Sequence, residues 1–130
     1  MPTTIPHQAV RDVGGRLVVE ILRAGHRAYF PDVPFIEAVE AELIVIEIMI
    51  AELDGKPFTT LRLAKHLQMP RTTLVRRIAY LVKKGALTRD ARSKLHISRS
   101  IVASPAGDRS AARVRQLILD AGNALSKMDS

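Results

Sequence analysis

Two short helical patterns follow one another in the middle of the chain, separated by a break of three residues. The stretch at 63–87 reads LAKHLQMPRTTLVRRIAYLVKKGAL, and QMP forms the break. Apolar residues recur three and four positions apart on both sides of it, which is the spacing of an amphipathic helix. Two short helices joined by such a turn are typical of a helix-turn-helix. We expect the first helix to start near Thr59 or Thr60 and the second to run from about 71 to 84, ended by Gly85.

Longer helices are expected at 10–28, 35–53 and 105–127, each with an apolar stripe. The segment 35–53 is apolar on most sides, so we expect it to be mostly buried. Its most regular stripe consists of Ile36, Val39, Leu43, Ile46, Ile50 and Leu53, and this stripe is widened by Ile44, Val45, Ile48 and Met49. After Gly85, the segments ALTRDA and RSIVAS are expected to be the two strands of a β-hairpin, around the basic connection RSKLHIS.

These elements predict a mainly α fold with a small β-hairpin wing, that is, a winged helix-turn-helix with N- and C-terminal dimerisation helices. A length of 130 residues predicts a single domain, 1–130, with a small core. Within it, the N-terminal helices would occupy 10–53, the winged helix-turn-helix 54–104 and the C-terminal helix 105–130. Aromatic residues make up only 4% of the chain, so the core must be aliphatic.

Residue types that enzymes, metal sites and secreted proteins require are missing or scattered. The chain has no cysteine, which excludes disulfides, thiolate zinc sites and thiol chemistry, and its four histidines lack the spacing of metal ligands. No glycine-rich phosphate loop or nucleophile motif is visible. The N-terminus lacks a signal peptide, and the most apolar segment, at 43–53, is too short to cross a bilayer. We expect a cytoplasmic protein without a membrane partner, catalytic site, metal or cofactor.

Positive charge is concentrated in the middle of the sequence. Residues 56–100 contain twelve Lys and Arg and one acid, for a net charge of +11, whereas the remainder contains eight bases and twelve acids, for a net charge of −4. Charge concentrated in this way favours a polyanionic partner.

The second short helix has a polar face opposite its apolar face, which consists of Leu74, Ile78, Leu81 and Val82. Arginine, threonine and lysine side chains on such a helix read base edges or contact phosphates in the major groove of duplex DNA. The candidate DNA-binding residues here are Arg71, Thr72, Thr73, Arg76, Arg77, Tyr80 and Lys83, with sequence readout expected from Thr72, Thr73 and Arg76. In the hairpin, at about 86–103, the candidates are Arg89, Arg92 and Lys94, because arginine is attracted to the minor groove. The alternative for both segments is a charged surface exposed to solvent.

The order of these elements resembles the MarR family of dimeric winged-helix transcription regulators, over roughly residues 35–125. The sequence FTTLRLAKHLQMPRTTLVRRIAYLVKKGALTR is similar to the helix-turn-helix of that family, and VASPAG at 102–107 is similar to its exit from the wing. The resemblance implies a transcription regulator with a small-molecule effector of unknown identity. Because members of this family are commonly repressors, it also implies repression. The family commonly has an Asp-x-Arg pair deep in the wing, where this chain has Leu95 and Ile97. Its own Asp90-Ala91-Arg92 lies five residues early.

The terminal helices carry more apolar surface than a small winged helix can cover, and exposed apolar patches usually mark an interface. This predicts a two-fold homodimer, whose target would be a near-palindrome with half-sites about one DNA turn apart. The candidate dimerisation residues are Leu17, Ile21, Val114, Ile118 and Leu125. The alternative function for this fold is a module for protein–protein contacts or for RNA binding, although Tyr80 alone could stack a base on the basic face.

Overall fold

A computed structural model of the chain describes residues 6–129, which form two compact units. The first unit consists of the chain up to Phe35 and the residues from Pro105 onwards, and the second consists of residues 36–104. The described residues are mainly helical with one small antiparallel hairpin, as the sequence predicts. The expectation that the whole chain acts as a single domain stays a prediction.

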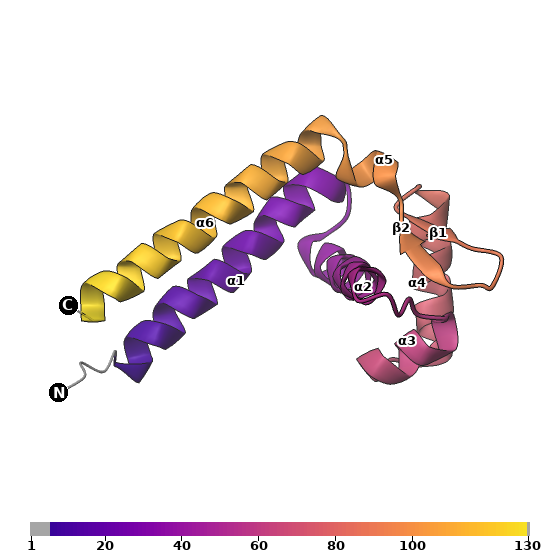
Figure 1. Ribbon diagram of the computed structural model, residues 1–130, viewed down its shortest axis with the longest axis horizontal. Helices are drawn as coiled ribbons and strands as arrows, with labels where there is room; N and C mark the ends of the chain where they lie inside the picture. Colours follow the sequence, from indigo (N-terminus) through magenta and orange to yellow (C-terminus); the bar gives the residue numbers. More distant parts are fainter. Residues whose placement is uncertain (1–5, 130) are drawn as a thin grey trace. The chain divides into compact units, whose positions relative to one another are not determined.

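The first unit is a pair of long helices, α1 (His7–Tyr29) and α6 (Pro105–Asp129), which lie side by side and run in opposite directions (Figure 1). Its buried residues are mostly small, among them Ala24, Gly25, Gly107 and Ser110. Four of the five candidate dimerisation residues are half-buried at helical spacing along the pair, namely Leu17, Ile21, Val114 and Leu125. The fifth, Ile118, is 52% exposed. Two helices alone cover only one side of each other, so most of the remaining surface of the pair is exposed.

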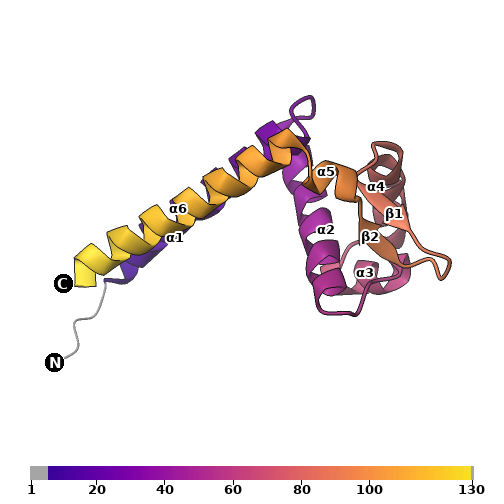
Figure 2. The same cartoon turned by 45° about the horizontal axis from the view of Figure 1, so that its top comes forward.

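The second unit contains α2 (Phe35–Leu53) apart from its first residue, α3 (Thr60–Leu67), α4 (Arg71–Lys83), the strands β1 (Leu87–Arg89) and β2 (Leu95–Ile97), and the short α5 (Arg99–Val102) (Figure 2). The largest fully buried side chains come from every one of these elements except α5: Ile44, Ile48, Leu63, Leu74, Ile78, Leu81, Leu87 and Leu95. All of them are aliphatic, which confirms the composition predicted for the core.

The helix α2 is less buried than the sequence predicts. Ala38, Ala41, Ile44, Ile48 and Ala51 are buried, whereas the predicted stripe includes residues that are 44–78% exposed, namely Ile36, Leu43, Ile50 and Leu53. At about 100° per residue, the two rows lie on roughly opposite sides of the helix. The prediction of a mostly buried helix was wrong because α2 is apolar on two sides and the neighbouring elements cover only one of them.

The first strand of the hairpin lies where the sequence predicts, but the second strand lies earlier in the sequence than predicted. Residues 87–89 of β1 pair with residues 97–95 of β2 in antiparallel register. The second strand therefore lies in the predicted connection, and the predicted strand RSIVAS contains α5 instead. Leu95 is fully buried, and its N–H donates a hydrogen bond of 2.8 Å to the carbonyl of Phe58. One buried leucine thus anchors a strand in a segment whose polar composition predicted a loop.

Within residues 6–129, no helix combines the length and the apolar composition needed to span a membrane.

Candidate nucleic-acid interface

Residues 68–70 form the turn that joins α3 to α4. Thr59 is the N-cap of α3 and accepts a hydrogen bond from the N–H of Arg62, which confirms the predicted start of this helix. Gln68 ends α3 in the left-handed conformation, with a φ of 55°. Pro70 fixes its own φ and has no N–H, so it separates the two helices. At the far end of α4, Gly85 has a φ of 85°, as expected of the residue that follows a helix.

The two sides of α4 differ as the helical wheel predicts. Leu74, Ile78 and Leu81 are fully buried, although Val82, predicted to join them, is 38% exposed. Five of the seven candidate DNA-binding residues of this helix are exposed, namely Arg71, Thr72, Arg76, Tyr80 and Lys83, and Thr73 is half-buried. The structure therefore gathers guanidinium, hydroxyl, phenol and ammonium groups on the outer side of one helix.

Arg77 is the exception among these candidates. Its guanidinium forms an ion pair with Glu40 of α2, and its side chain is 30% exposed. The Nε atom is buried and has no hydrogen-bond partner. Arg77 thus connects α4 to α2 and does not belong to the set of exposed side chains on the outer side of α4, which includes Arg76.

The N-terminus of α4 has no side-chain cap. Pro70 stands at the N-cap position without a side-chain hydrogen bond, and the first turn contains no acid. The first N–H groups of a helix have no partner within the helix and form the positive end of its dipole, so they attract an anion such as a phosphate. The exposed side chains of Arg71 and Thr72 extend from this same turn.

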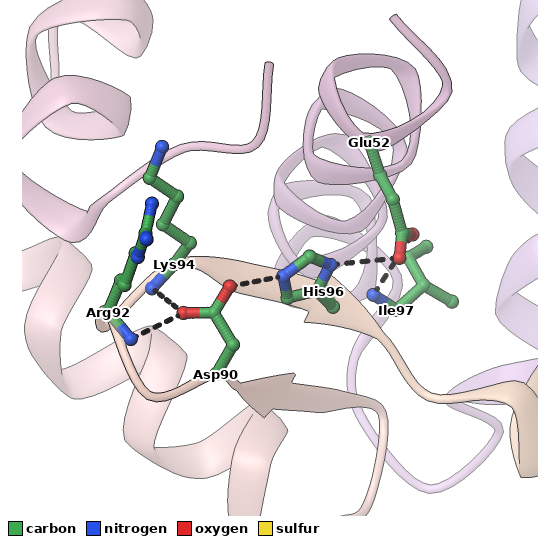
Figure 3. A network of polar contacts seen from close by, with 6 residues as sticks. All are labelled: Glu52, Asp90, Arg92, Lys94, His96 and Ile97. Carbon is green, nitrogen blue, oxygen red and sulfur yellow. Dashed lines mark hydrogen bonds and ion pairs between the residues drawn. The ribbon is translucent and has the colours of Figure 1, made fainter. Parts of the chain in front are cut away.

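The tip of the hairpin is organised by Asp90. Its Oδ1 atom accepts hydrogen bonds from the N–H of Arg92, at 2.8 Å, and of Lys94, at 3.0 Å (Figure 3). In the displaced Asp-Ala-Arg sequence, the carboxylate of Asp90 therefore orients the backbone of the turn, and none of its hydrogen bonds goes to the guanidinium of Arg92. The side chain of Arg92 is exposed and that of Lys94 is half-buried. Arg89, the third candidate of the hairpin, donates a hydrogen bond of 3.0 Å to Thr60 Oγ1 at the start of α3.

His96 connects the hairpin to α2 (Figure 3). Its Nε2 atom lies 2.9 Å from Asp90 Oδ2, and its Nδ1 atom lies 2.9 Å from Glu52 Oε1. Carboxylate oxygens only accept hydrogen bonds, so both contacts are hydrogen bonds only when both ring nitrogens carry a proton. The hydrogen bonds from Asp90 and Glu52 accordingly raise the pKa of His96 above its ordinary value. The bond to His96 and the N–H of Lys94 in turn lower the pKa of Asp90 to about 2.

The sequence patterns missed this cluster of Glu52, Asp90 and His96, which we call the His96 clamp. Glu52 Oε2 also accepts a long hydrogen bond, of 3.4 Å, from the N–H of Ile97, so α2 holds β2 through its backbone as well. Glu52 lies 44 positions before His96 in the sequence, and no spacing rule links it to the two hairpin residues. The one signal available was that Asp90 is the only acid in a strongly basic segment.

Comparison with known proteins adds no assignment: no family model, no curated protein and no solved structure matches this chain.

Proposed function

We propose that this protein is a sequence-specific regulator of transcription that binds double-stranded DNA as a homodimer. In this proposal the second unit is a winged helix-turn-helix of the MarR-like kind, α4 is the recognition helix and the hairpin is the wing. The observation that carries the proposal is the outer side of α4, where Arg71, Arg76 and Lys83 are exposed without an acid beside them on the helix. Repression is the expected mode of action, in the cytoplasm, with an effector of unknown identity.

The different surroundings of two neighbouring arginines support a role for Arg76 in recognising the DNA sequence. Arg77 is occupied by Glu40, whereas Arg76 is exposed and no ion pair or hydrogen bond of its side chain is seen within residues 6–129. A guanidinium that is free of internal partners can form the bidentate hydrogen bonds with guanine that are the commonest specific contact in the major groove. The uncapped start of α4 would hold a backbone phosphate and thereby fix the helix in the groove.

The hairpin supplies the second basic surface of the proposed interface. Arg92 lies at its tip, and Asp90 fixes the backbone on both sides of that residue. A preorganised tip reduces the conformational entropy lost when a side chain enters a groove. We propose Arg92 as the wing residue closest to the minor groove, with Lys94 and Arg89 nearer to the phosphates.

The surface of the first unit supports the proposed homodimer. Val18 of α1 is 57% exposed and Ile118 of α6 is 52% exposed, although both helices already pack on each other. Three glycines of these helices, Gly14, Gly15 and Gly122, have open space where a Cβ atom would stand. Glycine inside a helix costs about 1 kcal/mol relative to alanine, and it allows the backbone of another helix to come close. Exposed valine and isoleucine beside such glycines suit a helix pair from a second copy.

Selection of bound sequences from a random pool of duplex DNA tests this function. We expect an enriched near-palindrome with half-sites about 10 base pairs apart, centre to centre. Affinity should fall steeply with salt, because each neutralised phosphate contributes about 0.9 to the slope of log K against log salt. Failure to enrich any sequence, or an affinity that does not change with salt, would refute the proposal. Preferential binding of single-stranded RNA would instead support the alternative function.

A further inference from the structure

A hollow of about 240 Å³ lies between α1 and α6 within the first unit. Its lining consists of four small residues, Ala24, Ala28, Ala106 and Ser110, and three arginines, Arg27, Arg109 and Arg113. The hollow exists because the helices meet here through side chains of one or two heavy atoms, which leave room between the longer side chains around them. Ser110 is a buried polar residue of this lining, with 9% of its surface exposed.

The positive charge around this hollow has no internal counterpart. No acid is among the lining residues, and no ion pair of Arg27, Arg109 or Arg113 is seen in the part of the chain that the structure describes. Elsewhere in the chain Arg16 pairs with Asp12 and Arg77 pairs with Glu40. Arg27, Arg109 and Arg113 are all exposed, and arginine stays protonated at any physiological pH, so three positive charges that repel one another through solvent line the hollow and are accessible to an anion.

The spacing of two of these arginines along α6 increases the repulsion between their charges. Arg109 and Arg113 are four residues apart on α6 and therefore neighbours on one face, where like charges destabilise a helix. Arg27 approaches them from the last turns of α1. The hollow also lies at the first turns of α6, where the helix dipole favours negative charge.

From these observations we propose that the hollow is a binding site for a phosphate group, either free phosphate or the terminal phosphate of a small monoester. Guanidinium groups match the oxygens of phosphate in pairs and bind it more strongly than neutral donors do. Three arginines carry more positive charge than one carboxylate could neutralise, whereas a phosphate group carries about 1.5 to 2 negative charges near neutral pH. Ser110 adds a hydroxyl to the lining, which can donate a further hydrogen bond to a phosphate oxygen. This site is separate from the proposed DNA interface and does not depend on it.

Titration calorimetry of the full chain with sodium phosphate tests the proposal, at constant ionic strength with chloride as the balancing anion. We expect one phosphate per chain for the wild type and a loss of affinity of roughly tenfold or more for the double variant Arg109→Ala/Arg113→Ala. Arg115→Ala is the matched control, since Arg115 is an exposed arginine of the same helix that does not line the hollow. It should keep the wild-type affinity within about twofold. Circular dichroism of each variant without phosphate verifies that the helices are intact.

Two further titrations separate the possible sources of the phosphate. Phenyl phosphate should bind at least as well as free phosphate if a monoester is the natural ligand, and more weakly if the hollow takes the free ion. Duplex DNA should bind the double variant and the Arg115→Ala control equally. The proposal is wrong if the wild type binds no phosphate, if Arg115→Ala loses as much affinity as the double variant, or if the double variant loses its affinity for DNA to the same extent. In the last case the arginines contact the DNA backbone.

Discussion

His96 Nε2 lies 2.9 Å from Asp90 Oδ2, so the second strand of the hairpin is hydrogen-bonded to the first residue of its tip. The opposite ring nitrogen faces Glu52 of α2. One imidazolium thus joins the tip, which carries Arg92, to α2. The position of the proposed wing therefore depends on an imidazole whose pKa is raised by the hydrogen bonds to Asp90 and Glu52.

The first prediction concerns the pH dependence of stability. The folded-state pKa of His96 is raised above 6.5, so its contribution to the free energy of unfolding is complete below pH 6.5 and is lost as the pH rises through the raised pKa. The pKa of Asp90 is lowered from 3.8 to about 2, so its contribution is present above pH 3.8 and is lost as the pH falls through about 2. We expect His96→Gln to lower the free energy of unfolding most between pH 3.8 and pH 6.5, where both contributions are present. The effect should shrink towards pH 9, and urea unfolding at each pH measures it.

Comparing the variant with the wild type at each pH separates the contribution of His96 to stability from that of another titrating group. Burial raises the pKa of Glu42 to about 7, so this carboxyl also reduces stability as the pH rises. Its contribution is the same in both proteins and cancels in the difference. His7→Gln, at the exposed start of α1, is the control for loss of an imidazole. A difference between wild type and His96→Gln that stays constant from about pH 5 to about pH 9 would contradict the clamp.

The second prediction uses the adjacent arginines of α4 as a matched pair. Arg76→Ala should weaken binding to the selected DNA by about 1–3 kcal/mol, affect random DNA much less, and change the free energy of unfolding by no more than about 0.5 kcal/mol. Arg77→Ala should lower the free energy of unfolding by about 1 kcal/mol, because it breaks the pair with Glu40. DNA titrations and urea unfolding of both variants provide the measurements. Equal losses on selected and random DNA would make Arg76 a phosphate contact.

The third prediction concerns the wing. Replacing Arg92 and Lys94 together by glutamine should weaken DNA binding and reduce its dependence on salt, since two positive charges are removed from the interface. The free energy of unfolding should stay within about 0.5 kcal/mol, because Asp90 bonds to the backbone of these residues and both substitutions preserve it. Arg115→Gln in α6 serves as the control for the loss of a surface charge. If the affinity is unchanged, the hairpin does not contact DNA.

The fourth prediction concerns assembly. Ile118→Lys should convert a dimer into monomers at micromolar concentration, because it places a charge on the exposed apolar surface of α6. Val102→Lys, in α5, is the matched control, since Val102 is also 52% exposed but lies outside the two long helices. Val114 is a poorer choice, because it is half-buried and a charge there would disturb the packing of α6 on α1. A wild-type protein that is monomeric by light scattering would exclude the proposed dimer.

Local sequence signals predicted most of the elements of this fold. Thr59 as N-cap and Gly85 after α4 depend on the chemistry of single residues, so the helix boundaries they predict agree with the structure. The buried side of α4 followed from its period, because only one of its sides is apolar. Local signals did not predict the second strand correctly. Leu95 is buried although its segment is polar, and that burial depends on residues far away in the sequence.

The candidate site was predictable only to the level of the helix. Which residues of α4 face outward follows from the wheel, and most of the candidates are indeed exposed. The capture of Arg77 by Glu40 depends on how α4 packs on α2, which no local pattern describes. The His96 clamp likewise joins Glu52 to a residue 44 positions later, through the packing of a hairpin on a helix.

The glutamates of α2 have a consequence for the uniqueness of the fold. A helix with aliphatic rows on two opposite sides can lie against the same neighbours in two orientations, related by half a rotation about its axis. Glu40, Glu47 and Glu52 meet Arg77 on α4, His66 on α3 and His96 on β2, respectively. Half a rotation would remove all three carboxylates from their partners at once. Partly exposed pairs of this kind add little to the total free energy of unfolding, but they favour the observed orientation of α2 over the one related to it by half a rotation.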